Sequence, residues 1–396
     1  MKIEQRYILP PGFRSAGVHA GIKSNPAQRD MTLVVSDSPA TAAGVFTRNR
    51  VKAAPVKLDM ERISSGAGRA IIANSGNANA CTGEPGLLDA RRMAALTAQA
   101  TGLDEADIYV FSTGSIGVPL PMAAIARGIG MLAGQLSPND LHAPGGILTS
   151  DTFEKTATTT VLIDGQSVRL SALAKGAGMI EPNMATMLCF VMTDAAVESP
   201  ALQAALNTAT GSSFNRISID GDMSTNDSVM VLANGRAGNT ALNPAHPDWP
   251  VFLEALKALS LHLALRIVAD GEGTSKIITL HVEGACNDND ADLSARAIAN
   301  SLLVKTAWAG DYPVWSRIMD VLGYAGSEID EAKINIFIGD LPVAQGGLNA
   351  GTSREEVLAV TGESSYSIRV DLGLGSGKAV LYTADCTEEY VRLNMF

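Results

Sequence analysis

The sequence predicts a layered α/β protein, because short apolar runs of strand length alternate with alanine- and leucine-rich stretches of helix length. The chain has 396 residues, which is enough for two or three domains of roughly 150 residues each. Hydrophobic residues make up 46% of it, which is enough for a large core. Glycine is frequent, as is typical of proteins with many tightly turned loops. The alternation keeps no steady strand–helix–strand rhythm, so we expect stacked layers rather than a doubly wound parallel sheet.

The first half of the chain contains three predicted strands and two predicted helices. The strands are rich in β-branched and aromatic residues and span 31–36, 69–73 and 107–112. The helices span 86–102 and 121–134, and prolines stand at the start of the second helix. The Thr-Gly-Ser-Ile-Gly segment that follows residue 112 is expected to be a turn.

The second half continues the same pattern. The expected strands are 187–192, 227–233, 276–283 and 334–339. The expected helices are 199–212 and 250–269, and a proline-rich connector precedes the second one.

A glycine-rich segment near the C-terminus, 372–378, resembles a phosphate-binding loop. It begins with Leu372 instead of glycine, and Ala379 stands where a Walker A motif needs serine or threonine. We therefore interpret it as a turn.

The charge balance and the cysteine pattern limit the possible functions. The formal net charge is -11 and the pI is near 5.0, so phosphate backbones would repel the protein and nucleic acid is not expected as a partner. The four cysteines and five histidines are scattered without CxxC or HExxH spacing, so we expect neither a metal site nor a disulfide framework. The N-terminus lacks the apolar core of a signal peptide, and no apolar run approaches the roughly eighteen residues of a membrane span. We expect a cytoplasmic protein.

The segment from Lys175 to Leu188 carries the strongest chemical signal. It holds Gly176 and Gly178, and it leads to Thr186 at the mouth of the predicted strand 187–192. If the bond between residues 185 and 186 were cut, Thr186 would gain a free α-amine beside its own hydroxyl. A threonine paired with its N-terminal amine is an activated nucleophile. Strands that begin with threonine are common, so the spacing alone leaves both interpretations open.

Seven segments of the chain match one family in that family's order and span essentially the whole sequence. They are 40–50, 73–83, 112–117, 175–188, 220–227, 270–273 and 389–394. The chain resembles the ArgJ family, the glutamate N-acetyltransferases and ornithine acetyltransferases of arginine biosynthesis. The resemblance implies a layered α/β sandwich of the ArgJ/DmpA type that follows the logic of a self-cleaving N-terminal nucleophile.

The resemblance implies that Thr186 acts twice. The precursor would cut itself between Ala185 and Thr186 into an α chain, 1–185, and a β chain, 186–396, which assemble as an α2β2 heterotetramer. Thr186 would then take an acetyl group from N-acetylornithine and pass it to glutamate in a ping-pong reaction. No cofactor is implied, although some members also accept acetyl-CoA as a donor, and no motif decides whether this chain does.

The family's other site residues carry over onto matching positions. Thr113 and Gly114 would form the oxyanion hole, and substrate would be bound by Thr152, Lys175, Thr186, Glu272 and Asn394. Without the resemblance these residues have plainer interpretations. The Thr-Gly pair would be an ordinary turn after a strand, Glu272 a solvated acid after a helix, and Asn394 part of a frayed terminus.

The match also has departures from the family pattern. Tyr312, Val314, Ser316 and Met223 replace the family's usual residues, and the family's last substrate-contacting residue, beyond Asn394, has no counterpart. These differences bear on substrate range and efficiency. They leave the nucleophile and the oxyanion hole intact.

Two other functions remain open from the sequence. The same Thr186 would serve a self-cleaving amidase or aminopeptidase, in which water is the final acceptor and free acetate is released without glutamate. A protein that binds a metabolite of this pathway without turnover would form no acetyl-enzyme.

Overall fold

The computed structural model describes residues 1–181, 187–310 and 315–395, and the chain forms two compact units. Unit 1 comprises Met1–Gly176, Pro182–Asn215 and Met223–Ile267. Unit 2 comprises Ala177–Glu181, Arg216–Asp222 and Val268–Phe396. The chain therefore passes between the units several times, and each unit contains segments that are far apart in sequence.

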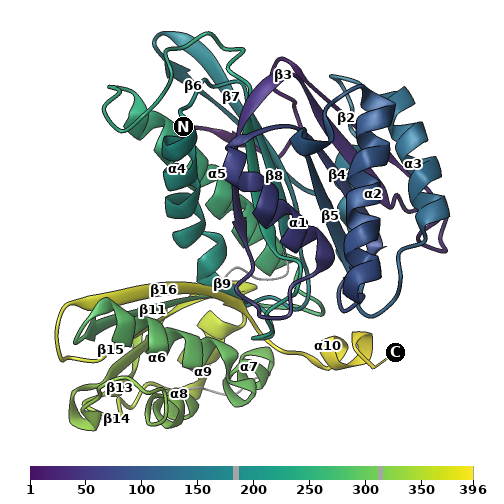
Figure 1. The fold of residues 1–396 in the computed structure, drawn as a ribbon. Coiled ribbons are helices and arrows are strands. Elements are labelled where there is room, and N and C mark those ends of the chain that lie inside the picture. Colours follow the sequence, from purple (N-terminus) through teal and green to yellow (C-terminus); the bar gives the residue numbers. More distant parts are fainter. Residues whose placement is uncertain (182–186, 311–314, 396) are drawn as a thin grey trace. The chain divides into compact units, whose positions relative to one another are not determined.

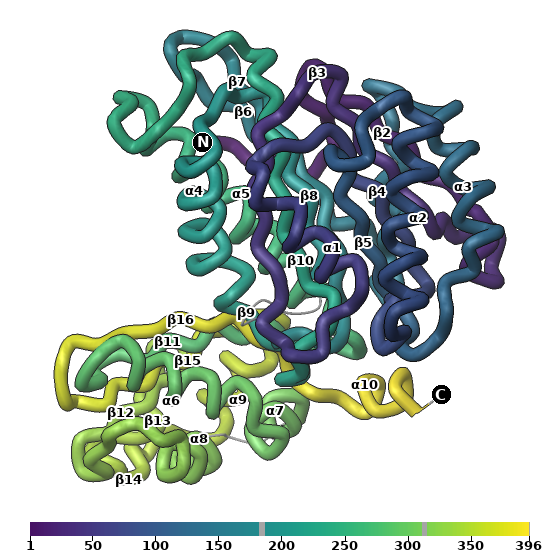
Figure 2. Tube along the Cα trace, in the orientation of Figure 1, coloured from purple at the N-terminus to yellow at the C-terminus, as the bar shows by residue number. Residues whose placement is uncertain are grey.

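Unit 1 is built on a nine-stranded mixed sheet whose path runs β1-β6-β7-β8-β10-β3-β4-β5, with β2 paired to β3. The strands are β1 Ile3–Glu4, β2 Phe13–Val18, β3 Met31–Phe46, β4 Ala67–Asn77, β5 Ile108–Ser115, β6 Lys155–Ile163, β7 Gln166–Lys175, β8 Leu188–Thr193 and β10 Ser228–Ala233. The β8–β10 and β4–β5 pairs are parallel and the other pairs are antiparallel. Figure 2 shows β8 and β10 side by side in the interior of this sheet.

Helices cover both faces of the unit 1 sheet, with α1, α2 and α3 to one side and α4 and α5 to the other (Figure 1). They are α1 Ala54–Arg62, α2 Gly83–Thr101, α3 Met122–Gln135, α4 Ser199–Gly211 and α5 Trp249–Ala269. Successive strand residues point to opposite faces, so Ile72 packs in the core beneath α2 and α3 while Ile71 packs in the core on the other face. Short 3-10 turns lie at Ile63–Ser65, Glu105–Asp107, Ala143–Ile147 and Phe214–Arg216.

Unit 2 has a seven-stranded sheet of order β14-β13-β12-β15-β11-β16-β9. Its strands are β9 Ile217–Ser218, β11 Ile277–Ala285, β12 Asn335–Ile338, β13 Leu341–Gln345, β14 Leu348–Asn349, β15 Ser365–Asp371 and β16 Gly377–Ala384. Its helices are α6 Asp288–Asn300, α7 Leu302–Ala309, α8 Trp315–Leu322, α9 Arg354–Thr361 and α10 Glu388–Leu393, with a 3-10 turn at Glu331–Lys333. One core joins the inner faces of α6, α7 and α8 to the central strands.

The predicted layered α/β architecture is confirmed, since each unit consists of a sheet with helices packed against it. Every helix and strand predicted from the sequence is present, and most lie within a few residues of their expected bounds. The strand predicted over 31–36 is much longer than expected and continues to Phe46. The strand predicted to end at residue 112 continues to Ser115, because β4 also continues and pairs with it. The expectation of a turn immediately after residue 112 is therefore wrong. Residues 372–376 of the glycine-rich segment lie between β15 and β16, as a turn would, and its last two residues begin β16.

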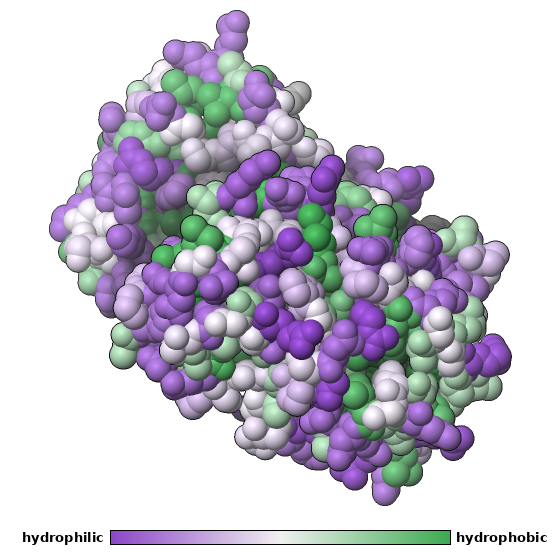
Figure 3. Space-filling model, turned by 90° about the horizontal axis from the view of Figure 1, so that it is seen from above, coloured by the Kyte–Doolittle hydropathy of each residue, from purple (hydrophilic) through white to green (hydrophobic). Residues whose placement is uncertain are grey.

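In the described part of the chain, no helix is both long enough and apolar enough to cross a membrane. On the face drawn in Figure 3, hydrophobic residues lie in small groups among hydrophilic ones. Such mixing is ordinary for a protein surface, because apolar atoms contribute much of the surface of any folded chain.

Candidate active site

The segment that carries the predicted nucleophile is anchored at both ends by the unit 1 sheet. Lys175 ends β7 and pairs with Leu188, the first residue of β8, which also pairs with Ser228 of β10. Thr186 and Ala185 lie outside the described residues. The next residue, Met187, is buried, donates its N–H to the Asp227 carboxylate at 2.9 Å, and accepts the Ser228 N–H at 3.0 Å. The chain that follows the predicted nucleophile is therefore held by hydrogen bonds through both its N–H and its carbonyl.

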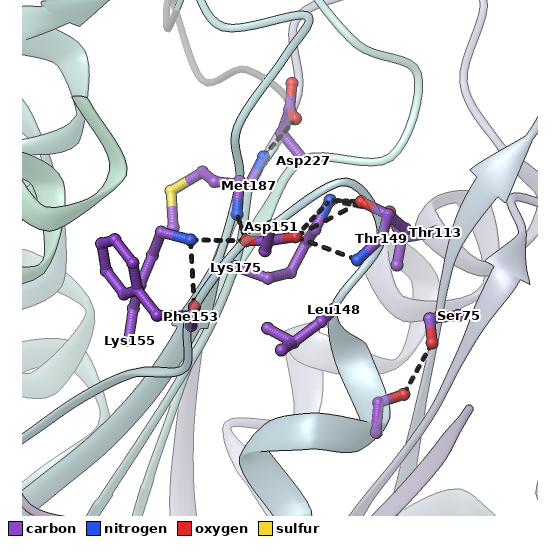
Figure 4. Close-up of polar contacts among 12 residues, drawn as sticks. Ser75, Thr113, Leu148, Thr149, Asp151, Phe153, Lys155, Lys175, Met187 and Asp227 are labelled. Atoms are coloured by element: carbon purple, nitrogen blue, oxygen red, sulfur yellow. Dashed lines mark hydrogen bonds and ion pairs between the residues drawn. The ribbon is translucent and has the colours of Figure 1, made fainter. Parts of the chain in front are cut away.

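Lys175 and Thr113 meet in the buried interior of unit 1. The Lys175 ammonium donates to the Thr149 hydroxyl at 2.6 Å and to the Thr113 hydroxyl at 3.4 Å, and it lies 3.8 Å from an oxygen of Asp151 (Figure 4). Both Lys175 and Thr113 are buried. The structure thus brings together one predicted substrate-binding residue and one predicted oxyanion-hole residue that lie 62 positions apart.

Asp151 is the anionic centre of this network. Its Oδ1 accepts from the Lys155 ammonium at 2.6 Å and from the Gly176 N–H at 2.7 Å, and its Oδ2 accepts the Thr149 N–H at 2.9 Å. Burial by itself would raise the pKa of Asp151, but Lys175 and Lys155 outweigh it and hold that pKa well below its usual range. Asp151 is therefore ionised and balances part of the positive charge of two buried lysines.

Gly114 follows Thr113 in β5 and makes an unusually close approach to β4. Its φ is +132°, and a Cβ at this position would lie 2.4 Å from the carbonyl carbon of Gly76. The β4–β5 register also shifts here, where Asn77 faces both Thr113 and Ser115. Only glycine fits such a position without displacing the neighbouring strand. The local backbone is irregular at the point where the predicted oxyanion hole requires a specially directed N–H.

Thr152 is exposed and directly follows Asp151 in the chain. Sequence reasoning selected Thr152 and Lys175 but missed Thr149 and Asp151. The available signal was the run of polar residues from Thr149 to Thr152 just before β6, in which a carboxylate stands among hydroxyls. Its link to Lys175 was not visible, because the two segments are joined only by the folding of β6 and β7.

Glu272 and Asn394, the other predicted substrate residues, meet in unit 2. The Asn394 side-chain amide donates to Glu272 Oε2 at 2.8 Å, and Asn394 lies at the end of α10. Glu272 is half-buried, and its N–H donates to the Ala177 carbonyl. A Cβ on Gly178 would lie 2.6 Å from the Glu272 carboxyl carbon, so Gly178 leaves room for the carboxylate. These contacts favour an ordered Glu272–Asn394 pair over the plainer interpretations, in which Glu272 is a solvated acid after a helix and Asn394 belongs to a frayed terminus.

The positions that depart from the family pattern fall outside this network where they are described. Met223 offers its backbone carbonyl to Asn49 at 2.9 Å, and Ser316 is exposed on α8. Tyr312 and Val314 lie outside the described residues.

One group of metal-ligand type side chains occurs among the described residues, comprising Asp164, His246 and Asp248. His246 Nδ1 accepts the Asp248 N–H at 3.0 Å, and its Nε2 lies 3.2 Å from Asp164. Asp164 Oδ2 accepts the Thr240 N–H, and Asp248 Oδ2 accepts the Asp164 N–H. Because these contacts tie loops of unit 1 together, the group has a structural explanation.

Comparison with known proteins identifies the family. The model of the ArgJ family matches residues 14–395. A protein of Geobacter sulfurreducens named arginine biosynthesis bifunctional protein ArgJ is 46% identical over 385 residues, 97% of this chain and 98% of the relative. A protein of the same name from Symbiobacterium thermophilum is 46% identical over 387 residues, 97% of this chain and 96% of the relative.

A solved structure agrees with these sequence relatives. The crystal structure of arginine biosynthesis bifunctional protein ArgJ from Bacillus halodurans is 43% identical, with a TM-score of 0.50. The match covers 52% of this chain and 97% of the solved chain. The resemblance drawn from the seven sequence segments is therefore confirmed. The family model matches nearly the whole chain, and both relatives, each 46% identical, are named arginine biosynthesis bifunctional protein ArgJ. The chain therefore belongs to the ArgJ family.

Proposed function

We propose that this protein is an acetyltransferase of arginine biosynthesis, which moves an acetyl group from N-acetylornithine to glutamate through Thr186. Membership of the ArgJ family supports the reaction. The observation that carries the assignment of residues is the buried hydrogen bond from Lys175 to Thr113, beside the start of β8. This hydrogen bond joins a cation to a hydroxyl group, and Lys175 itself pairs with the first residue of β8, the strand that follows Thr186 and Met187.

Self-cleavage comes first in this mechanism. The Thr186 hydroxyl attacks the Ala185 carbonyl carbon and the bond from that carbon to the Thr186 nitrogen breaks, which leaves an ester and a free α-amine. Water then hydrolyses the ester, so Ala185 ends as a carboxylate and the Thr186 hydroxyl is restored. The new α-amine can accept the hydroxyl proton in later turnovers, as in other N-terminal threonine nucleophiles.

Acetyl transfer uses the same hydroxyl. Thr186 attacks the acetyl carbonyl of N-acetylornithine, the bond to the ornithine nitrogen breaks, and ornithine leaves as an amine after taking up a proton. The amine of glutamate then attacks the acetyl ester, which yields N-acetylglutamate and regenerates Thr186. A covalent ester divides one difficult amide exchange into two easier steps.

Each step places negative charge on a carbonyl oxygen, and we assign its stabilisation to Thr113 and Gly114. The Thr113 hydroxyl accepts from the Lys175 ammonium, so its own proton remains available to a developing oxyanion. Donation from a cation also strengthens the hydroxyl as a donor. The Gly114 N–H belongs to a stretch of backbone that only glycine can adopt.

The remaining substrate contacts are proposed residue by residue. Lys175 and Thr152 are assigned to polar groups of the substrate, since an ammonium suits a carboxylate. Glu272 is assigned to a substrate amine, with Asn394 orienting the carboxylate through its 2.8 Å hydrogen bond. The substrates are small molecules, acetyl-CoA is a candidate second donor, and the protein acts in the cytoplasm.

The predicted α and β chains, 1–185 and 186–396, belong to the same proposal, as does their α2β2 assembly. The solved structure from Bacillus halodurans supports the cut. The match takes in 97% of that solved chain but only 52% of this chain. A chain of about half the length is what cleavage near the middle would leave.

Intact mass under denaturing conditions, followed by incubation with N-acetylornithine, tests the proposal. We expect two fragments, the second beginning at Thr186, and an added acetyl group on that second fragment. Thr186→Ala should remain one chain and form no acetyl-enzyme. Thr193→Ala, at the far end of β8, is the matched control and should still be cleaved. A single full-length wild-type chain that forms no acetyl-enzyme would refute the assignment.

A further inference from the structure

The dipeptide Asn226–Asp227 has no role in the mechanism above, although it lies in one of the segments that match the family. Both side chains are buried, at 5% and 1% exposure. They stand in the loop that leads into β10, directly before Ser228. Buried polar side chains need hydrogen-bond partners, and those of this pair belong to segments far away in the sequence.

Asp227 faces the residue that follows the nucleophile. Its Oδ1 accepts the Met187 N–H at 2.9 Å, and this N–H belongs to the peptide bond between Thr186 and Met187. Figure 4 shows the Asp227 carboxylate directed at the Met187 nitrogen. The other oxygen of Asp227 is buried and has no hydrogen-bond partner among the described residues. The hydrogen bond to Met187 ties this side chain to the entry of β8.

Asn226 faces the other half of the catalytic machinery. Its side-chain amide donates to the Ser112 carbonyl at 2.7 Å and to the Ala78 carbonyl at 2.7 Å. Ser112 immediately precedes Thr113 in β5. The Asn226 Oδ1 accepts from the Thr225 hydroxyl, so this amide is held in one orientation.

The sheet alone does not join these two places. The strands β8 and β5 are separated by β10, β3 and β4 in the sheet order. The loop that carries Asn226 runs past the ends of these strands, and the Asp227 carbonyl accepts the Thr47 N–H just beyond β3. It contacts the chain after β4 at Ala78 and β5 at Ser112. One short loop thus contacts Met187, which follows the proposed nucleophile, and Ser112, which precedes Thr113.

We propose that Asn226 and Asp227 are a positioning pair that sets where the entry of β8, and hence Thr186, lies relative to Thr113. Asp227 does this by accepting the Met187 N–H, and Asn226 by fixing the strand that presents Thr113. The inference rests on the proposed role of Thr186 as nucleophile. A reacting group misplaced by about 1 Å can cost roughly 100-fold in rate, so such a pair affects turnover more than substrate binding.

Burial agrees with an acceptor role for Asp227 that does not require its charge. It raises the pKa of Asp227 well above the usual range, against the opposing effects of the Met187 N–H, the Thr47 side chain and Lys175. Asparagine has the same shape and keeps an oxygen that can accept the Met187 N–H. Asp227→Asn is therefore the conservative variant, and Asp227→Ala is the disruptive one.

The test compares cleaved fraction, kcat per cleaved chain, KM and melting temperature across Asp227→Ala, Asp227→Asn and Asn226→Ala. We expect Asp227→Ala and Asn226→Ala to lower kcat by about 100-fold with KM changed less than about 3-fold. Asp227→Asn should restore kcat to within about 5-fold of wild type. The expected split between kcat and KM, and the rescue by asparagine, would not arise from a general loss of stability.

Asp194 supplies a matched control. It is also a buried carboxylate that accepts a backbone N–H, that of Arg169 at 2.7 Å, and burial also raises its pKa. It follows Thr193, at the end of β8 that lies away from Met187. Asp194→Ala should lower the melting temperature and leave kcat of the folded enzyme unchanged. If Asp194→Ala reduces kcat as much as Asp227→Ala does, the effect is general and the positioning role is refuted.

The remaining outcomes separate this inference from the proposed function. A wild-type protein that forms no acetyl-enzyme would overturn the proposed function and this role with it. An active wild type with unchanged kcat in Asp227→Ala and Asn226→Ala would overturn the positioning role alone. If Asp227→Ala does not fold, Asn226→Ala decides: a 100-fold loss of kcat supports the pair, and a wild-type kcat refutes it.

Discussion

At the scale of single residues, the site is organised by one carboxylate and two lysines in a buried place. Lys155 and Asp151 both have side chains with 0% exposure, and Lys175 lies close to the same carboxylate. A buried ion pair contributes little net stability compared with apolar packing, but removal of one partner leaves an uncompensated charge. The network therefore fixes geometry, and the Lys175–Thr113 hydrogen bond connects it to a residue of the proposed oxyanion hole.

Replacement of Thr113 should separate catalysis from binding. Thr113→Val keeps the shape but removes the hydroxyl, so we expect kcat to fall by about 10²–10³ with a smaller change in KM. Thr113→Ser keeps the hydroxyl and should retain most of the activity. Steady-state kinetics of acetyl transfer provide the measurement. A valine variant within about 3-fold of wild type would return Thr113 to a purely structural role.

Replacement of Asp151 should destabilise unit 1. In Asp151→Asn two buried ammonium groups lose their counter-charge, and we expect unfolding to become easier by about 3 kcal/mol at pH 7. Because the folded-state pKa of Asp151 lies below its usual value, its stabilisation is present above about pH 4 and is lost as the pH falls further. Denaturant unfolding at several pH values should show the gap between variant and wild type narrowing in acid.

Asp37 offers the comparison for that experiment. It is exposed and pairs with Arg14 at 2.8 Å at the surface, with side-chain exposures of 41% and 39%. Asp37→Asn should change stability by less than about 1 kcal/mol, because surface ion pairs are largely screened. Equal effects of the two substitutions would show that Asp151 is not the buried electrostatic centre described above.

At the scale of elements, the β4–β5 pair has an irregular register at the proposed oxyanion-hole residues. Two parallel strands run in regular register from Ala70 and Ile108 until the shift at Asn77. From that point the backbone of Gly114 approaches β4 too closely for any side chain. A shift of register that re-aims backbone groups is a usual device next to active sites.

This irregularity predicts the effect of a single methyl group. Gly114→Ala adds a Cβ into the backbone of Gly76 at a positive φ, so we expect a loss of more than about 1 kcal/mol in stability and impaired acetyl transfer. Thermal unfolding and transfer kinetics check the two effects.

Gly130 is the matched glycine for this experiment. It lies exposed in α3, where an added Cβ would meet nothing within 4 Å. Gly130→Ala should stabilise the protein by about 0.5–1 kcal/mol, because alanine favours helix more than glycine does. A Gly114→Ala variant as stable and active as Gly130→Ala would contradict the close approach.

At the scale of the whole molecule, the predicted cut and the two compact units divide the chain differently. The cut at 185/186 falls between β7 and β8, which are hydrogen-bonded neighbours in the unit 1 sheet. The C-terminal piece contributes β8 and β10, and strands of the N-terminal piece flank them on both sides, β7 next to β8 and β3 next to β10. Two chains would therefore share one sheet, and separating them would break it on both sides.

Cleaved protein should accordingly remain one particle. We expect both fragments to elute together in native size-exclusion chromatography, at the volume of uncleaved Thr186→Ala, and to separate only in denaturant. The physical reason is that β8 and β10 lie wholly buried in the interior of the sheet. Fragments that elute apart under native conditions would be inconsistent with this strand order.

The sequence by itself determined the alternation of strands and helices, the family, and the candidate nucleophile, because these depend on local residue patterns and on ordered motifs. The family resemblance also indicated Lys175 and Thr113 as candidates. Local patterns missed several elements, including the β6–β7 hairpin and α6 to α9, and the continuation of β5 past residue 112. In the last case the partner strand β4, not the local turn propensity, decides where the strand ends.

Only the tertiary structure decided which residues act together. Asp151 lies 24 positions from Lys175, and Asn226 lies 114 positions from Ser112, yet each pair is in contact. Such contacts depend on the sheet order, which places β8 and β10 between strands from the first half of the chain. A sequence shows what chemistry each side chain can do, but the energy of a buried charge or hydrogen bond depends on neighbours that only folding supplies.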